Sequence, residues 1–296
     1  MNPDPEPQRD VKLDPELDAL RNWIGRTEQR TDDAMAAPLA ALSATLDRDD
    51  PLPGPGSDVP PLGHWLYFLP VAPRREIGAD GHPRRGGFLP PVPLPRRMWA
   101  GGRFRFHHPL HVGDAIARTS RIEDVTVKHG RSGALVFVTV RHDITNASGI
   151  ALTESHDIVY RDNPRPGAPA PTPQTAPADS HFSRRIVPDP VLLFRYSALT
   201  FNGHRIHYDR SYVTGVEGYP GLIVHGPLVA TLLLDLLRRT MPDAVIETFA
   251  FRAVKPLFDI APFSVHGQVE PDGKTVKLWA SDADGWLAMD ASATIA

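Results

Sequence analysis

Two short segments of the chain hold residue types that could carry acid–base chemistry on a carbonyl compound. Residues 201–209 read Phe-Asn-Gly-His-Arg-Ile-His-Tyr-Asp, which places an amide, Asn202, five positions before an imidazole, His207. A neutral imidazole can accept a proton from water and return one to a leaving hydroxyl. Residues 221–228 read Gly-Leu-Ile-Val-His-Gly-Pro-Leu and run into an apolar helix, whose first N–H groups have no partner within the helix. A base beside free backbone donors suits thioester chemistry, in which negative charge develops on the carbonyl oxygen.

Gly226 is the expected oxyanion donor at this helix start. Pro227 has no N–H, so the residue before it must supply the donor if the helix end holds the thioester oxygen. The alternative is that this glycine only lets the helix pack closely against a strand.

The two segments resemble the motifs of the MaoC-type hydratases and dehydratases. The family motif Gly-Asp-x-Asn-Pro-x-His-x-Asp aligns its histidine with His207 and its last aspartate with Asp209, and residues 221–228 resemble the family stretch Gly-x-x-x-His-Gly. Asn202 stands where the family has a catalytic aspartate, and an amide cannot take up a proton. The resemblance implies that His207 is the only base, while Asn202 either positions water or substrate or caps the following turn.

Three neighbours are candidate substrate-binding residues under this resemblance. A cation at His204 or Arg205 could pair with a substrate carboxylate, and the alternative for the arginine is a plain surface position. His225, before Gly226, is either a substrate contact or a structural neighbour. With the ordinary histidine pKa of about 6.5, protonation of His207 would remove activity on the acid side.

Composition argues against several other chemistries. The chain has no cysteine, which excludes disulfides, thiolate catalysis and cysteine-type zinc sites. Its formal net charge of −3 gives no reason to expect nucleic acid as a partner. No phosphate-binding loop, dinucleotide-binding glycine motif or nucleophile elbow is present, and the histidine group at 107, 108 and 111 has no acid pair near it. We expect no metal and no cofactor, with CoA entering as part of the substrate.

The elements that must position these residues fall into two similar halves. Residues 1–13 read as a disordered tail, and the first half spans 14–162. Helices are expected from Asp14-Pro15 and from Thr31-Asp32-Asp33, because a capping acid and a proline mark helix starts. A short strand is expected over 65–71. Alternating apolar residues predict further strands at 104–106, 115–127, 135–144 and 151–160.

The first half also holds a long loop, residues 72–98, rich in glycine, proline and arginine. Loops of this length in compact domains are often functional or mobile. Its arginines are either solvated or contact the phosphates of a CoA-type ligand. They are Arg74, Arg75, Arg84, Arg85, Arg96 and Arg97.

The second half, 184–296, follows a linker over 163–183 that lacks apolar periodicity. A helix is expected after Asp189-Pro190, and the segment 227–239 predicts a helix that is apolar nearly all round and therefore buried by a sheet. Strands are expected at 246–254, 263–269, 275–281 and 286–295. The pattern of helix and antiparallel strands in each half, together with the resemblance, predicts an α+β double hotdog: two helix-wrapped antiparallel sheets in one chain. Only the second half carries the catalytic motif.

The resemblance implies a hydro-lyase that adds water to an enoyl thioester. The family members with the most similar motif act on branched C5 dicarboxyl-CoA thioesters (3-methylfumaryl-CoA or itaconyl-CoA) or belong with the mitochondrial 3-hydroxyacyl-thioester dehydratase. The alternatives are a 3-hydroxyacyl-ACP or -CoA dehydratase of fatty acid synthesis and, because Asn202 replaces the aspartate, a non-catalytic acyl-thioester binding protein. The amino end has no secretory signal and no apolar run reaches the roughly 18 residues of a membrane span. We expect a cytoplasmic protein whose partner is an acyl-CoA or acyl-ACP thioester, with a homodimer left open and no membrane contact.

Overall fold

A computed structural model describes residues 15–130, 133–163 and 172–296. The expected disordered tail, 1–13, and part of the expected linker lie outside these ranges. The strands are β1 (Thr27–Asp33), β2 (Arg96–Phe106), β3 (Ala115–Gly130), β4 (Gly133–Asn146), β5 (Gly149–Arg161), β6 (Phe182–Ile186), β7 (Ile246–Ala253), β8 (Phe263–Val269), β9 (Thr275–Ser281) and β10 (Leu287–Ile295). The helices are α1 (Pro15–Ala19), α2 (Ala36–Thr45), α3 (Pro190–Leu199), α4 (Arg210–Gly215) and α5 (Gly226–Thr240), with single 3₁₀ turns at η1 (Leu20–Trp23), η2 (Gly63–Leu66), η3 (Arg74–Glu76) and η4 (Arg205–His207).

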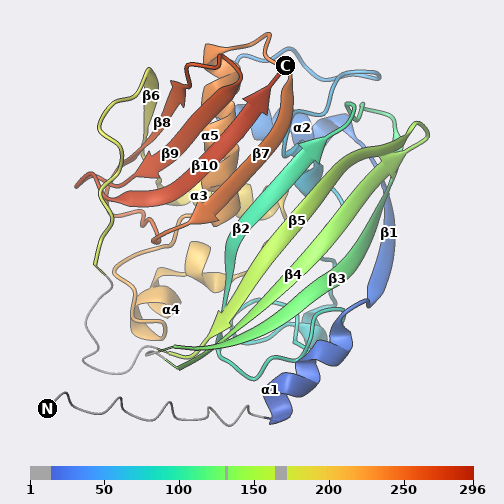
Figure 1. Ribbon diagram of the computed structural model, residues 1–296, viewed down its shortest axis with the longest axis vertical. Coiled ribbons are helices and arrows are strands. Elements are labelled where there is room, and N and C mark those ends of the chain that lie inside the picture. Colours follow the sequence, from blue (N-terminus) through green and yellow to red (C-terminus); the bar gives the residue numbers. More distant parts are fainter. Residues whose placement is uncertain (1–14, 131–132, 164–171) are drawn as a thin grey trace, which may run out of the picture.

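The described strands form one sheet of ten in the order β1-β3-β4-β5-β2-β7-β10-β9-β8-β6, and every pairing is antiparallel (Figure 1). The halves meet where β2 pairs with β7, from Gly101 opposite Arg252 to Arg105 opposite Thr248. The sheet of the first half therefore continues into the sheet of the second, and its antiparallel pairing agrees with the predicted α+β class.

Helix α5 is the core of the second half. It packs against β6, β8, β9 and β10, and every residue from Leu228 to Leu237 is buried. Because the helix is apolar on all sides, it can be stable only when enclosed in this way. Its one buried charge, Asp235, is bound by Arg48, Arg184 and Arg239 at 2.6 to 2.8 Å. Since Arg48 belongs to the first half, this cluster also ties the two halves together.

Two expectations for the first half were wrong. Thr31 to Asp33 does not begin a helix but ends β1, which pairs with β3 at the edge of the sheet; the expected helix itself is present and starts later, as α2, with Leu39 and Leu42 buried. Residues 65–71 are not a strand, because η2 takes up Gly63–Leu66 and an irregular segment follows. Strand β1 is polar and mostly exposed, so it shows none of the apolar alternation by which strands are recognised.

Two further strands lie where the sequence predicted a loop and a linker. Strand β2 begins at Arg96, inside the predicted loop 72–98, and β6 begins at Phe182, inside the predicted linker 163–183. The end of that linker is also hydrogen-bonded: Leu287 N–H donates to Gln174 O at 2.7 Å, and Ala176 N–H donates to Gly285 O at 3.0 Å.

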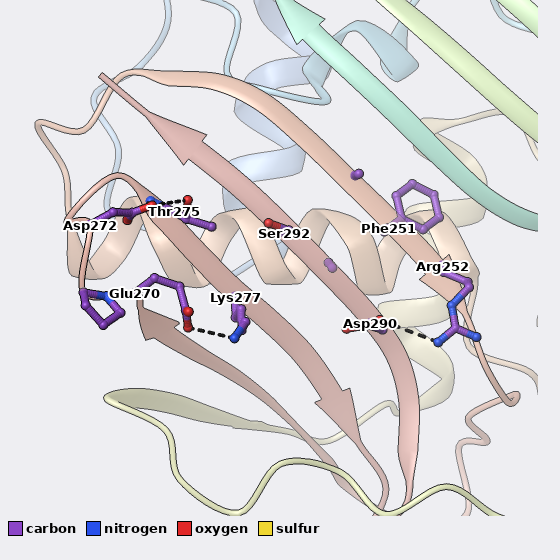
Figure 2. A pocket seen from close by; sticks show the side chains of 11 residues that line it. Phe251, Arg252, Glu270, Asp272, Thr275, Lys277, Asp290 and Ser292 are labelled. Carbon is purple, nitrogen blue, oxygen red and sulfur yellow. Dashed lines mark hydrogen bonds and ion pairs between the residues drawn. The ribbon is translucent and has the colours of Figure 1, made fainter.

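The face of the sheet opposite α5 is polar and carries a hollow of about 510 Å³ over β7, β9 and β10 (Figure 2). Ion pairs cross it, Lys277 with Glu270 at 3.0 Å and Arg252 with Asp290 at 3.6 Å. None of the candidate site residues lines it. Within the described ranges, no helix has the length and apolar character needed to span a membrane.

Candidate active site

The turn between α3 and η4 holds Asn202 in a defined orientation. Its Oδ1 accepts a hydrogen bond from His204 N–H at 3.0 Å, and its own N–H donates to Ser197 O at 2.8 Å. The side-chain oxygen thus caps the turn, which was one of the two interpretations of this residue. The Nδ2 amide group makes no hydrogen bond to the described residues and is free to donate to a water or substrate.

His207 is held in the tautomer that a general base requires. Its Nδ1 lies 2.7 Å from Ile223 O, and a carbonyl can only accept, so Nδ1 carries the proton and Nε2 keeps its lone pair. Ile223 N–H in turn donates to Ile206 O at 3.0 Å, which joins the two motif segments. The ring is 7% exposed. This burial lowers the pKa of His207 to about 4, so the acid-side loss of activity expected near the ordinary histidine value shifts to lower pH.

His225 lies directly against the base. Its ring stacks on that of His207 with centroids 3.7 Å apart, and its Nε2 lies 2.8 Å from Ser197 Oγ. Its Nδ1 is buried and has no hydrogen-bond partner in the described part of the chain. Burial lowers the pKa of His225 well below its ordinary value, so the residue is neutral beside a neutral His207.

Gly226 opens α5 next to these rings. Its N–H has no acceptor among the described residues, and no atom lies within 4 Å of the place where a side chain would begin. The donor is therefore unengaged, as an oxyanion-binding N–H must be. Since His225 precedes it and stacks on His207, the donor and the base belong to one small site.

A loop from the first half closes over the catalytic turn. Arg205 N–H donates to Asp80 O at 2.9 Å, and its guanidinium donates to Ala79 O at 3.0 Å. Gly81 has φ +91°, and a Cβ there would lie 1.8 Å from Gly203 O, so this backbone contact requires glycine. The residues contributed by this loop were not singled out from the sequence, where only its length and its glycines mark it.

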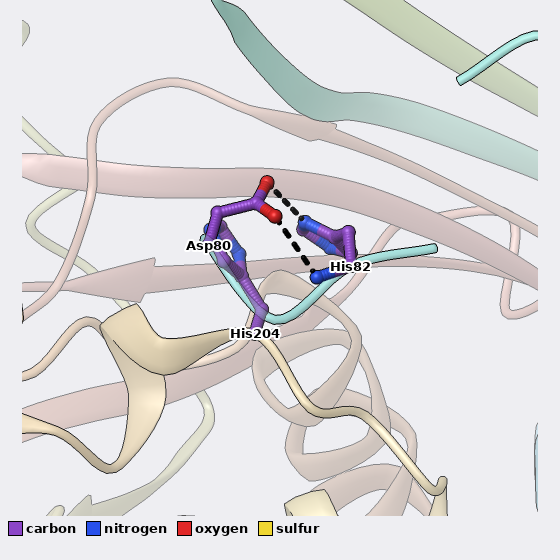
Figure 3. Close-up of side chains that lie close together, drawn as sticks. All are labelled: Asp80, His82 and His204. Atoms are coloured by element: carbon purple, nitrogen blue, oxygen red, sulfur yellow. Dashed lines mark hydrogen bonds and ion pairs between the residues drawn. The ribbon is translucent and has the colours of Figure 1, made fainter. Parts of the chain in front are cut away.

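The loop places His82 and Asp80 beside His204 (Figure 3). The rings of His82 and His204 have centroids 3.9 Å apart, and the ring of His204 lies 5.5 Å from that of His207. Burial lowers the pKa of both His82 and His204, to about 2 for His204. Both imidazoles are therefore neutral at physiological pH, and His204 joins the site as a neutral group rather than as the cation considered from the sequence.

The same three side chains are the described group whose atoms could ligate a metal, with potential ligand atoms within 4.8 Å of one another. Both carboxylate oxygens of Asp80 already accept hydrogen bonds from His82, at 3.0 Å from its N–H and 3.2 Å from Nδ1.

Arg205 faces the scaffold rather than the base. Its guanidinium donates to Asp209 Oδ2 at 3.0 and 2.8 Å and lies 4.2 Å from the ring centre of Tyr212. The Asp209 carboxylate also accepts from Tyr212 N–H at 3.0 Å and so caps α4. The motif's last aspartate and its arginine thus fix the helix that follows, while a substrate-binding role for Arg205 stays a prediction.

Five of the six arginines of the 72–98 loop separate into two groups. Arg85 donates to the carbonyls of Val92, Leu94 and Pro95, and Arg96 donates to Asn163 Oδ1 at 2.8 Å and Tyr219 Oη at 2.9 Å. These two are structural. Arg74, Arg75 and Arg84 are exposed, and contact between them and CoA phosphates stays a prediction.

The interior of the first half contains charged and polar groups that the sequence did not reveal. Glu154 is 3% exposed, lies 3.0 Å from His64 Nε2 and accepts from Trp65 Nε1 at 3.3 Å. His156 stacks on Trp99 with centroids 3.8 Å apart. Glu154 and His156 are two residues apart on β5 and so point to one face of the sheet.

The fold and the site together define a hydro-lyase of the MaoC-like, double-hotdog type. The model of the family "Hydroxyacyl-thioester dehydratase type 2" matches residues 62–259, and the chain belongs to this family.

Known proteins support the same class. The chain is 50% identical over 273 residues to mesaconyl-C(4)-CoA hydratase of Chloroflexus aurantiacus, a match that covers 91% of this chain and 95% of the relative. It is 28% identical over 259 residues to the mitochondrial hydroxyacyl-thioester dehydratase type 2 of Schizosaccharomyces pombe, covering 77% of this chain and 86% of the relative. A Mycobacterium tuberculosis protein with a double hotdog fold is similar with a TM-score of 0.58 at 14% identity, over 95% of this chain and 98% of that one. The predicted fold class and the predicted hydro-lyase activity are confirmed.

Proposed function

We propose that this hydro-lyase adds water across the double bond of mesaconyl-C(4)-CoA, the thioester named for the 50% identical relative. Mesaconate is methylfumarate, so this compound is the 3-methylfumaryl-CoA expected from the motif. Itaconyl-CoA and a 3-hydroxyacyl thioester are the competing substrates. Membership of a dehydratase family argues against the alternative of a non-catalytic binding protein.

The chemistry follows from the free groups of the site. The Asn202 Nδ2 amide donates to a water, and His207 Nε2 takes one of its protons as the oxygen bonds to the β-carbon. The double-bond electrons move towards the thioester oxygen, where the Gly226 N–H stabilises the enolate. The imidazolium of His207 then gives its proton to the α-carbon, which regenerates the base and completes the addition of one water.

The observation that carries this proposal is the hydrogen bond from His207 Nδ1 to Ile223 O. It leaves Nε2 unprotonated in a buried place, on a ring that stacks against His225 next to the unengaged helix start. No other group is needed for the proton transfer, so replacement of the family's aspartate by Asn202 is compatible with catalysis.

Turnover by the purified full chain tests the proposal. Loss of enoyl-thioester absorbance would be followed with mesaconyl-C(4)-CoA, itaconyl-CoA and crotonyl-CoA at equal concentrations, and His207→Ala would serve as the inactive control. We expect the highest kcat/KM for mesaconyl-C(4)-CoA. A higher value for crotonyl-CoA would point to the fatty acid alternative, and no turnover of any of the three would contradict the proposal.

A further inference from the structure

Asp80, His82 and His204 form a cluster of one carboxylate and two imidazoles beside the catalytic turn (Figure 3). Each of these described residues offers one atom of a type that ligates metals, and the three atoms lie within 4.8 Å of one another. The rings of His82 and His204 have centroids 3.9 Å apart, and Asp80 Oδ2 lies 3.2 Å from His82 Nδ1. The proposed proton transfer uses none of the three side chains.

The backbone holds the cluster together from both halves of the chain. Asp80 and His82 belong to a tight turn, in which Gly78 N–H donates to His82 O at 2.7 Å. This turn is joined to the segment of His204 by Arg205 N–H, which donates to Asp80 O at 2.9 Å. The three side chains are therefore brought together by the fold itself, and binding of an ion would not have to order them first.

The cluster has lone pairs to spare. Neither His82 Nε2 nor the ring nitrogens of His204 form a hydrogen bond with the described residues. Burial lowers the pKa of both imidazoles, so both are neutral, as metal ligands must be. A carboxylate has about four lone-pair sites, so the two hydrogen bonds from His82 leave Asp80 able to accept another bond. All three side chains are only partly buried, and an ion can reach them from solvent.

The ligand types select the kind of ion. Two imidazole nitrogens and one carboxylate oxygen suit Zn²⁺ and similar transition-metal ions, whereas Mg²⁺ and Ca²⁺ prefer oxygen ligands throughout. With metal–ligand bonds of about 2.0–2.2 Å, ligand atoms of a tetrahedral site lie roughly 3.3–3.5 Å apart. The observed spacing, within 4.8 Å, can therefore close around an ion by side-chain movements of about 1 Å.

We propose that Asp80, His82 and His204 bind one divalent transition-metal ion, for which Zn²⁺ is the best match, with water in the fourth position. The ion joins the loop of the first half to the turn of the second half, two segments far apart in the chain. Because it binds only where the two segments meet, it should stabilise the folded protein.

Zinc titration of the full chain tests the site. The untagged protein would be stripped of metal with a chelator and then titrated with Zn²⁺ by calorimetry, and with Co²⁺, whose visible spectrum reports its ligands. We expect one ion per chain. At a Zn²⁺ concentration about 100 times Kd, the melting temperature should rise by roughly 5 °C, because the ion binds the folded chain alone.

Variants of the three ligands locate the ion. His82→Ala, His204→Ala and Asp80→Asn should each raise the Kd for Zn²⁺ at least about tenfold, since loss of a ligand costs no less than loss of an outer hydrogen-bond partner. His111→Ala is the control, because the partly exposed His111 imidazole lies 3.3 Å from the Asp58 carboxylate, and it should keep wild-type affinity. Melts without metal would confirm folding, and Asp80→Asn, which keeps the side-chain size, serves if a histidine variant does not fold.

Wild-type affinity in the folded ligand variants, or an equal loss in His111→Ala, would show an adventitious ion only and overturn the proposal. Absence of Zn²⁺ binding by the wild type would overturn it as well. Turnover of mesaconyl-C(4)-CoA is a separate measurement that can be made in the presence of the chelator. Failure of the metal site would therefore leave the proposed hydratase function standing.

Discussion

The imidazole rings of His207 and His225 stack face to face, with centroids 3.7 Å apart and an angle of 18° between their planes. The Ser197 hydroxyl forms a hydrogen bond with His225 Nε2, and His207 Nδ1 donates one to Ile223 O. The charge of a protonated His207 lowers the pKa of His225, so the two rings cannot readily be protonated together. The stacking contact restrains the ring of His207 and forms no hydrogen bond to it.

His207→Ala should remove general-base catalysis and lower kcat/KM for the preferred enoyl thioester about 10²–10⁴-fold. Asn202→Asp should not restore the lost activity if Asn202 only positions water, and Asn202→Ala alone should cost less than His207→Ala. The exposed His107 provides a control variant, His107→Ala, which should retain full activity. A folded His207→Ala protein with near wild-type turnover would show that the base lies elsewhere.

On the acid side, the pH dependence of kcat/KM should follow the protonation of the buried His207 imidazole. Burial lowers the pKa of His207 to about 4, and the base acts in its unprotonated form, so activity should be retained as the pH falls from 7 to about 5 and be lost near pH 4. Initial rates after a rapid pH jump, with circular dichroism to follow unfolding, would separate protonation from loss of structure. A midpoint near pH 6.5 in folded protein would mean that His207 is not desolvated in the active enzyme.

Gly81→Ala should lower kcat/KM by displacing the backbone of the loop, although Gly81 has no part in the proton transfer. The new Cβ would lie 1.8 Å from Gly203 O and force the loop off the catalytic turn, and a displacement of about 1 Å at a site can cost about 10²-fold in rate. Gly86→Ala is the matched control, because Gly86 has a similar φ of +96° but no atom within 4 Å of its Cβ position. Equal losses of kcat/KM in the two variants would show that the contact with Gly203 does not matter for turnover.

Asp235→Asn should destabilise the whole protein. The Asp235 side chain is 1% exposed and offsets the charges of Arg48, Arg184 and Arg239, so its neutralisation leaves the partly buried Arg184 and Arg239 without a carboxylate at a cost of up to about 3–5 kcal/mol. Urea unfolding would measure the change, with Asp290→Asn as control because its ion pair with Arg252 is exposed and should contribute under about 1 kcal/mol. Similar unfolding midpoints for the two variants would contradict this account.

Most of the second half could be predicted from the sequence, because α5 and β7 to β10 carry long apolar patterns. The edge strands β1 and β6 could not, since an exposed edge needs no apolar face and leaves no such pattern. The motif residues His207, Asn202 and Gly226 could be singled out by their resemblance to the family motif, and their roles stay predictions. His82 was not, because its place beside His204 depends on a contact between the backbones at Gly81 and Gly203, far apart in the chain.

The pairing of β2 with β7 joins two halves of different sequence in one chain. Each half can therefore change independently, whereas in a pair of identical subunits every substitution appears in both. His207, Asn202 and the start of α5 come from one half, while the loop that contacts their turn through Asp80 and Gly81 comes from the other. Substitutions in 78–97 can therefore change the loop that lies against the turn at Gly203 without changing His207, Asn202 or Gly226. We expect exchange of this segment between relatives to shift the ratio of kcat/KM values between thioesters while turnover is kept.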